Sequence, residues 1–140
     1  MRRYNRWLLH IVLAVIGGGL YVLIELLWRR RSHISMFCVG GICFALIGSI
    51  HERFSRLTLT LRCALCAVAV TAVEFASGCL INRSWGLNVW DYSNQPHHIL
   101  GQVCPLYTFL WGVLSAFAWP VYRFCRQRLE RRLSPCAGRR

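Results

Sequence analysis

The length of its apolar blocks constrains this chain more than any other feature. A helix of about 20 apolar residues spans the hydrocarbon core of a bilayer, and only helices and closed barrels satisfy their backbone hydrogen bonds there. The sequence therefore predicts an all-α polytopic membrane protein with four transmembrane helices in a single domain, residues 1–124. The predicted spans are residues 7–28, 34–50, 59–81 and 103–124.

A polar segment separates the third span from the fourth. Residues 86–104 read GLNVWDYSNQPHHILGQVC. Pro96 prevents a continuous helix, and Asp91 and Ser93 favour a capped turn. Irregular backbone at membrane depth persists only where protein or water satisfies its polar groups. We therefore expect a folded-back polar segment that covers the outer mouth of the bundle.

The basic residues are all arginine, and they give the chain a formal net charge of +12. They border the apolar blocks instead of lining one soluble face, which indicates contact with lipid head groups and argues against nucleic-acid binding. Four crossings place thirteen arginines on one side of the membrane and four on the other. The positive-inside rule then predicts a multi-pass protein with both termini in the cytoplasm. We expect it in the bacterial plasma (inner) membrane.

The carboxyl-terminal residues 125–140 form a basic cytoplasmic tail. This tail can extend the last helix as an amphipathic stretch on anionic lipid, ended by Pro135 and Gly138. It can equally be a partly disordered charged tail. The sequence leaves both alternatives open.

Cysteine and histidine are frequent but do not predict a metal or a cofactor. Most of the 8 cysteines lie in or beside apolar stretches, where free cysteine behaves as a small hydrophobic residue. Cys63 and Cys66 form a C-x-x-C motif, but no second pair completes a zinc site. His97 and His98 are adjacent in the polar segment without a cysteine or carboxylate at ligand spacing. We expect no bound metal and no cofactor.

Two acids lie inside the predicted spans, where a carboxylate costs roughly 2.5 kcal/mol or more. Each must be protonated, paired or turned toward a polar interior. Glu25 precedes Arg29 by four residues, so the two can form an interfacial ion pair. Glu74 has no basic residue within one turn, and its partner must come from another helix or from residues 82–102. Glu74 is therefore the stronger functional candidate.

Small residues share helical faces with these acids and predict close helix contacts. Without a Cβ, glycine lets a second backbone approach, as in the small-residue motifs of membrane helices. The sequence of the second span, ISMFCVGGICFALIGSI, is typical of such a packing helix. The helix-packing candidates are Gly18, Gly40, Gly41, Gly48 and Gly78.

Five segments together resemble a known family: GLYVLIELLWR, HISMFCVGGICFALIG, EFASGCLIN, NVWDYSNQP and GQVCPLYTFLWGVLS. In this order they resemble the putative ABC-transporter type IV family, the CmpB-like membrane proteins, over roughly residues 15–120. The resemblance implies a small integral membrane protein labelled a permease. His97 and His98 depart from the family pattern. The positions that match it are Glu25, Gly40, Gly41, Glu74, Asn88, Trp90, Asp91, Tyr92, Ser93, Pro96, Gly101 and Gln102.

These observations predict a permease-like protein with a polar pocket in its outer half. Carboxylates beside tryptophan and tyrosine hold a cation through charge and ring quadrupole together, so the expected ligand is a cation or a coupled proton. The expected substrate-binding residues are Glu25, Glu74, Asn88, Trp90, Asp91, Tyr92, Ser93 and Gln102.

Four helices are few for a translocation path, so we expect a homo-oligomer or a partner membrane subunit. The nucleotide-binding signature G-x-x-x-x-G-K-[ST] requires a lysine, and the chain has none. Any ATPase is therefore expected on a separate subunit.

Two alternative functions remain. In the first, the protein is a non-transporting assembly or regulatory factor, and the same residues only lock the bundle through hydrogen bonds. In the second, it is a membrane enzyme with Glu74 or Asp91 as base and His97 or His98 as acid. No nucleophile and base are spaced to support catalysis, so we expect that the protein is not an enzyme.

Overall fold

The computed structural model describes residues 6–133, and they fold into helices joined by short turns and one longer segment. No strand occurs in this part of the chain. The helices are α1 (Arg6–Arg29), α2 (Ile34–Arg53), α3 (Leu59–Gly78) with its π-helical extension η1 (Cys79–Ser84), and α4 (Pro105–Leu133). The all-α prediction is confirmed for these residues.

Local sequence signals explain where the helices begin. Thr58 caps α3, since its hydroxyl accepts a hydrogen bond from the Leu61 N–H at 3.4 Å. His33 caps α2 in the same way, with Nδ1 accepting from the Ser35 N–H at 3.2 Å. Pro105 opens α4, where its missing N–H costs no helical hydrogen bond.

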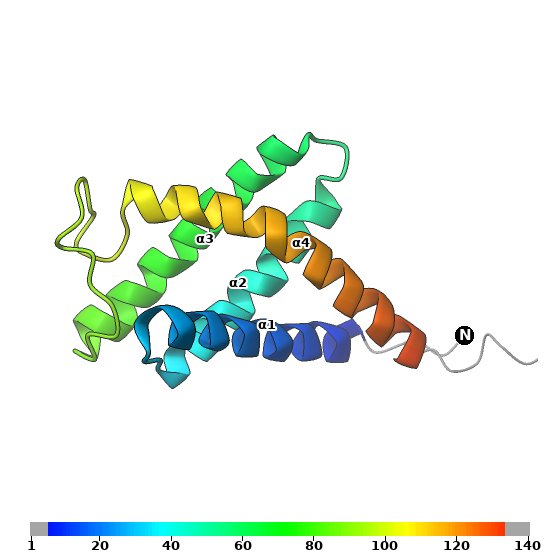
Figure 1. The fold of residues 1–140 in the computed structure, drawn as a ribbon, viewed down its shortest axis with the longest axis horizontal. Coiled ribbons are helices and arrows are strands. Elements are labelled where there is room, and N and C mark those ends of the chain that lie inside the picture. The colour runs from blue at the N-terminus through cyan, green and yellow to red at the C-terminus, as the bar shows by residue number, and fades with distance from the viewer. Residues whose placement is uncertain (1–5, 134–140) are drawn as a thin grey trace, which may run out of the picture.

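In Figure 1, α2 and α3 run in opposite directions, and α1 and α4 cross them. α1 makes its most extensive contacts with α2, and α3 makes its most extensive contacts with α4. Residues 30–33 and 85–104 gather at one end of the bundle, which we call the loop end (Figure 1). The start of α1, the turn of residues 54–58 and the end of α4 gather at the other, which we call the terminal end.

Three of these helical segments are long and apolar enough to cross a membrane: Arg6–Arg29, Ile34–Arg53 and Leu59–Ser84. The fourth predicted span lies in α4, which does not reach the same apolarity because tryptophan, tyrosine and proline interrupt its apolar half and arginines fill the rest. The fold thus supplies three candidate spans among its four α-helices.

Buried side chains form three clusters along the bundle axis. The first lies toward the terminal end, the second near the middle, and the third at the loop end. Their buried members are Leu9, Leu13, Phe44 and Tyr122; then Cys43, Ile47, Cys66 and Val70; then Met36, Ile81 and Trp90. Tyr122 and Trp90 show that aromatic rings, as well as aliphatic side chains, fill the interior.

Glycine lets these helices approach at the backbone. A Cβ atom at Gly41 would lie 2.5 Å from the Ala14 carbonyl oxygen, so α1 and α2 meet main chain against main chain. Gly40 lies under the Tyr21 ring in the same interface. Gly18 lies against the Phe37 carbonyl, Gly48 against the Tyr122 ring, and Gly78 against Gln102 and Trp90.

Two helices extend beyond the spans predicted for them, and for the last helix this is one of the two alternatives that the sequence left open. The third helix does not end at residue 81 but continues through Ser84 as a π-helix. The fourth continues beyond residue 124, passes through Pro120 without ending and reaches Leu133. Residues 125–133, assigned to the tail from sequence, are therefore helical. Pro135 and Gly138, the predicted end of the tail helix, lie outside the described residues.

Candidate functional site

Glu74 is the polar centre of the loop end. Its side chain is only 4% exposed, and each carboxylate oxygen accepts one hydrogen bond. The Tyr92 hydroxyl donates to Oε1 at 2.8 Å, and the Trp111 indole N–H donates to Oε2 at 2.9 Å. Burial and the neighbouring Glu74 raise the pKa of the Tyr92 phenol, so it stays protonated and donates. Partners from α4 and from residues 82–102 were both allowed by the sequence, and both are present.

Glu25 forms the ion pair predicted with Arg29. Its side chain is 6% exposed, and Arg29 Nη2 lies 2.5 Å from Oε1. The Ser32 hydroxyl donates to Oε2 at 2.6 Å. Arg29 also donates to the Val89 carbonyl at 3.3 Å, which ties the end of α1 to the segment before α4. The predicted ion pair is confirmed, and Arg29 adds a contact between distant parts of the chain.

Asn82 organises the segment from residue 85 to residue 104. Its amide Nδ2 donates to the Trp90 carbonyl at 3.0 Å and to Gln102 Oε1 at 2.8 Å, while Oδ1 accepts from the Val89 N–H at 2.7 Å. The π-helical turn η1 carries this side chain and keeps it buried. One side chain therefore holds the beginning and the end of the irregular segment together.

Trp90 and Gln102 anchor that segment against α3. The buried Trp90 indole donates to the Gln102 carbonyl at 3.1 Å. The Gln102 amide in turn donates to the Leu100 carbonyl at 3.1 Å. A Cβ atom at Gly78 would lie 2.5 Å from Gln102 Oε1 and 3.1 Å from the Trp90 ring, so only glycine leaves room for both.

Asp91 and Ser93 form the capped turn predicted from the sequence, and Gly101 packs against it. Asp91 Oδ1 accepts from the Ser93 N–H at 2.9 Å and from the Ser93 hydroxyl at 2.5 Å. These bonds hold the pKa of the Asp91 carboxyl below its usual range. Gly101 has φ +69°, and a Cβ atom there would lie 2.7 Å from Ser93 Oγ. Asn88 is exposed, with a left-handed φ of 45° that asparagine tolerates better than most residues.

A groove of about 500 Å³ opens beside these residues, between α1 and α4 at the loop end. Two stacked ring pairs stand in its walls: Tyr21 with Trp111 at 5.9 Å between centroids, and Tyr92 with Tyr107 at 4.4 Å. The polar side chains of the Glu25–Arg29 pair lie at its edge. The full lining is Tyr21, Ile24, Glu25, Trp28, Arg29, Met36, Trp90, Tyr92, Tyr107, Leu110, Trp111, Val113, Leu114 and Phe117.

The family model described as Putative ABC-transporter type IV matches residues 5–137 of this sequence. The chain belongs to this family. No curated protein and no solved structure matches it. Family membership and three apolar helices together make the chain a transport-related membrane protein.

The substrate-binding residues predicted for this type IV family member fall into three groups. Glu25, Trp90 and Tyr92 line the groove. Glu74 lies behind the lining, bonded to the wall residues Tyr92 and Trp111. The remaining candidates hold the shape of the 85–104 segment and do not line the groove: Asn88, Asp91, Ser93 and Gln102.

Several groove residues were not predicted from the sequence. Tyr21 and Trp28 share a helical face with Glu25, at spacings of four and three residues. Tyr107 and Trp111 are spaced by four in α4. This helical spacing of aromatic residues was the available signal, but it does not distinguish a groove wall from a lipid-facing stripe. Within residues 6–133, no three His, Cys, Asp or Glu side chains are grouped as metal ligands would be.

Proposed function

We propose that this chain is a permease-like membrane subunit whose loop-end groove holds an organic cation with an apolar body. The observation that carries the proposal is the groove of about 500 Å³ itself, which combines an aromatic lining with the carboxylate of Glu25. Cations bind over the faces of tryptophan and tyrosine, and the interaction strengthens when water is excluded. The aliphatic side chains of the groove suit the apolar part of such a ligand.

The charges around the groove favour a cation over an anion. Glu25 and Arg29 neutralise each other at the rim. Glu74 adds a further carboxylate behind Tyr92 and Trp111, and both of these residues line the groove. An ionised Glu74 therefore leaves the site with net negative charge. A protonated Glu74 would lose this preference, which would couple ligand binding to a proton.

In this proposal α4 is the fourth span and residues 85–104 fold back over the outer mouth of the bundle. The exposed Phe109 and Phe117 support a lipid-facing side of α4. The terminal end then lies in the cytoplasm of a bacterial cell, with the helices in the inner membrane. The protein binds and moves its ligand without a catalytic step, as a homo-oligomer or with a partner membrane subunit. Any ATPase that drives it is a separate subunit.

The test compares two tryptophans of α1 with similar exposure. Trp28 is 81% exposed and lines the groove, whereas Trp7 is 79% exposed and lies at the terminal end. Purified protein is titrated with tetrabutylammonium, and the dissociation constant is measured by calorimetry. Loss of one cation–ring contact, about 1 kcal/mol, should weaken binding by roughly fivefold in Trp28→Ala. Trp7→Ala should bind like the parent protein.

Transport is measured separately, as uptake of radiolabelled tetrabutylammonium into liposomes containing the protein. Trp28→Ala should lower this uptake, and Trp7→Ala should leave it unchanged. Equal binding by both variants contradicts the groove as the ligand site. Binding without uptake contradicts the permease role.

A second candidate function is a non-transporting assembly subunit, and one observation favours it. Both oxygens of Glu74 are already bonded, so this acid joins α3, α4 and the 85–104 segment without any ligand. Under this alternative, Glu74→Gln lowers thermal stability and leaves the tetrabutylammonium dissociation constant unchanged. Under the permease proposal, both quantities change.

A further inference from the structure

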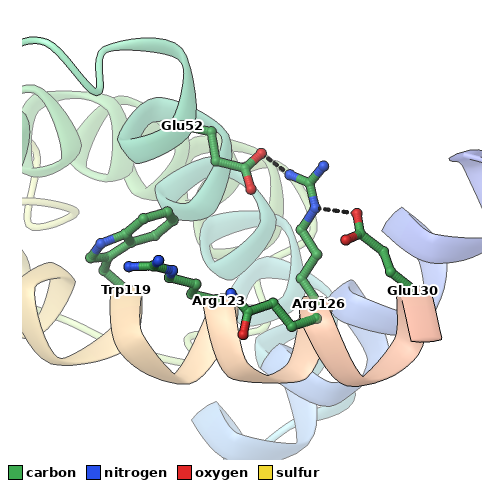
Figure 2. Close-up of a pocket in the computed structure, with 6 residues that line it drawn as sticks. Glu52, Trp119, Arg123, Arg126 and Glu130 are labelled. Carbon is green, nitrogen blue, oxygen red and sulfur yellow. Dashed lines mark hydrogen bonds and ion pairs between the residues drawn. The ribbon is translucent and has the colours of Figure 1, made fainter. Parts of the chain in front are cut away.

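A second cavity lies nearer the terminal end of the bundle and shares no lining residue with the groove. It has a volume of about 400 Å³ and is formed between the end of α2 and the basic half of α4. Figure 2 shows its charged side chains. Its lining residues are Glu52, Trp119, Arg123, Arg126, Gln127 and Glu130.

The cavity has a negative part made by two acids that share one arginine. Arg126 Nε donates to Glu130 Oε1 at 2.9 Å, and Arg126 Nη1 pairs with Glu52 Oε2 (Figure 2). Two carboxylates against one guanidinium leave a net charge of −1. Arg126 is therefore paired with both acids, while each glutamate keeps lone pairs for another donor.

Arg123 supplies the positive part. It forms no ion pair with any acid in the part of the chain that the structure describes. Its side chain is directed toward Trp119, on the opposite side of the cavity from Glu130 (Figure 2). Gln127 lies one turn along α4 from Arg123 and adds an amide. The cavity thus carries two arginines and two glutamates with separated charge.

We propose that this cavity binds the headgroup of a zwitterionic phospholipid that carries a primary ammonium group, of the ethanolamine type. The phosphate lies at Arg123, and the ammonium donates to Glu52 and Glu130. Arginine is suited to phosphate because its guanidinium presents several donors in one plane. A primary ammonium has three N–H donors for the carboxylates. This inference does not depend on the function proposed for the groove.

The order of residues along α4 fits the order of groups in such a lipid. Trp119 suits the interface between acyl chains and headgroups. Arg123 follows one turn further from the bundle centre, and Glu130 lies about 10 Å beyond Arg123 at 1.5 Å per residue. Phe124 is exposed on the opposite face of α4 at the level of Arg123, which supports a membrane boundary near this turn. The partner of the phosphate therefore lies nearer the membrane, and the partners of the ammonium lie further out, as in the lipid itself.

The charges of the cavity also argue against an anionic lipid, the kind that basic membrane proteins often bind. A glycerol headgroup would bring a phosphate charge but no ammonium, and Arg126 alone offsets only one of the two charges of Glu52 and Glu130. A choline headgroup carries a positive charge but has no N–H to donate to the carboxylates. An ethanolamine headgroup supplies both a phosphate for Arg123 and an N–H donor group for the two glutamates.

The test is native mass spectrometry of the full chain in maltoside micelles, titrated with three palmitoyl-oleoyl lipids. Phosphatidylethanolamine should bind more tightly than phosphatidylcholine or phosphatidylglycerol. Arg123→Ala should weaken phosphatidylethanolamine binding by about tenfold, the effect of losing one charge-assisted contact. Arg128→Ala removes the same charge from the Phe124 face and should leave binding unchanged.

Glu130→Gln provides an independent arm, because Glu52 still holds Arg126 in that variant. It should reduce the preference for phosphatidylethanolamine over phosphatidylcholine and leave phosphatidylcholine binding as it was. The proposal is overturned if phosphatidylglycerol binds as tightly as phosphatidylethanolamine, or if Arg123→Ala and Arg128→Ala behave alike. Full competition by soluble phosphoethanolamine at equal concentration would overturn the lipid as the source of the headgroup.

Discussion

At the scale of single residues, two buried polar side chains determine the loop end. Glu74, on α3, bonds to α4 and to the irregular segment through its two oxygens. Asn82 bonds to both the beginning and the end of that segment. The sequence predicted that Glu74 needs partners but not which ones, because Tyr92 and Trp111 are distant in the chain. The central position of Asn82 depends on a π-helical turn that the sequence pattern does not predict.

Replacing Glu74 tests the first of these residues. In Glu74→Gln the new NH₂ group faces a donor, so one buried hydrogen bond is lost and one donor is left unsatisfied. We expect a loss of about 1–3 kcal/mol in the free energy of unfolding. Tyr92→Phe should cost about 1 kcal/mol because it removes one donor. A double-mutant cycle from thermal or denaturant unfolding should show coupling, and additive effects would contradict the bond.

Asn82→Ala tests the second of these two buried side chains. This variant leaves the Val89 N–H and the Gln102 amide oxygen without their buried partner, so we expect a loss of about 1–3 kcal/mol. The 85–104 segment should also become more susceptible to proteolysis, as measured by fragment masses after limited digestion. Asn94→Ala is the control, since Asn94 is exposed in the same segment. Similar digestion of both variants would contradict the role of Asn82.

At the scale of helices, the apolar blocks predicted where each element lies, and packing determined how far it extends. All four helices overlap the predicted ranges, because block length and flanking arginines are local signals. The π-helical continuation of α3 depends on Asn82 reaching the segment before α4, which is a tertiary contact. The continuation of α4 to Leu133 places Arg126 against Glu52 of α2, which a pattern within α4 cannot predict.

The contact of α2 with α4 at Gly48 gives a prediction for helix packing. A Cβ atom at Gly48 would overlap the buried Tyr122 ring, so Gly48→Ala should destabilise the protein by about 1–3 kcal/mol through overpacking. Gly19 in α1 has open space at the same position. Gly19→Ala should instead stabilise by up to about 1 kcal/mol through helix propensity. Thermal unfolding of the two variants should move in opposite directions, and parallel shifts would contradict this packing.

At the scale of the whole molecule, the sequence predicted the membrane class and the family, while the groove required the fold. The apolar blocks and the arginines that flank them are properties of the chain itself, so they can be recognised in the sequence. The groove depends on how α1 crosses α4, and its walls come from residues more than eighty positions apart. Four of the predicted binding residues shape the 85–104 segment instead of lining that groove.

The arrangement of ends predicts the result of a topology experiment. With the native cysteines replaced, single cysteines are introduced by Asn94→Cys at the loop end and Ser55→Cys at the terminal end. A membrane-impermeant thiol reagent added to intact cells should label the first and not the second. After the membrane is permeabilised, both should react. Labelling of Ser55→Cys in intact cells would contradict the proposed orientation.

The unequal packing of α1 has a mechanical consequence. α1 is interlocked with α2 through glycine, but it touches α4 much less. The two walls of the groove therefore belong to helices that have few direct contacts with each other. Ligands of different girth can be accommodated by a shift of α1 relative to α4.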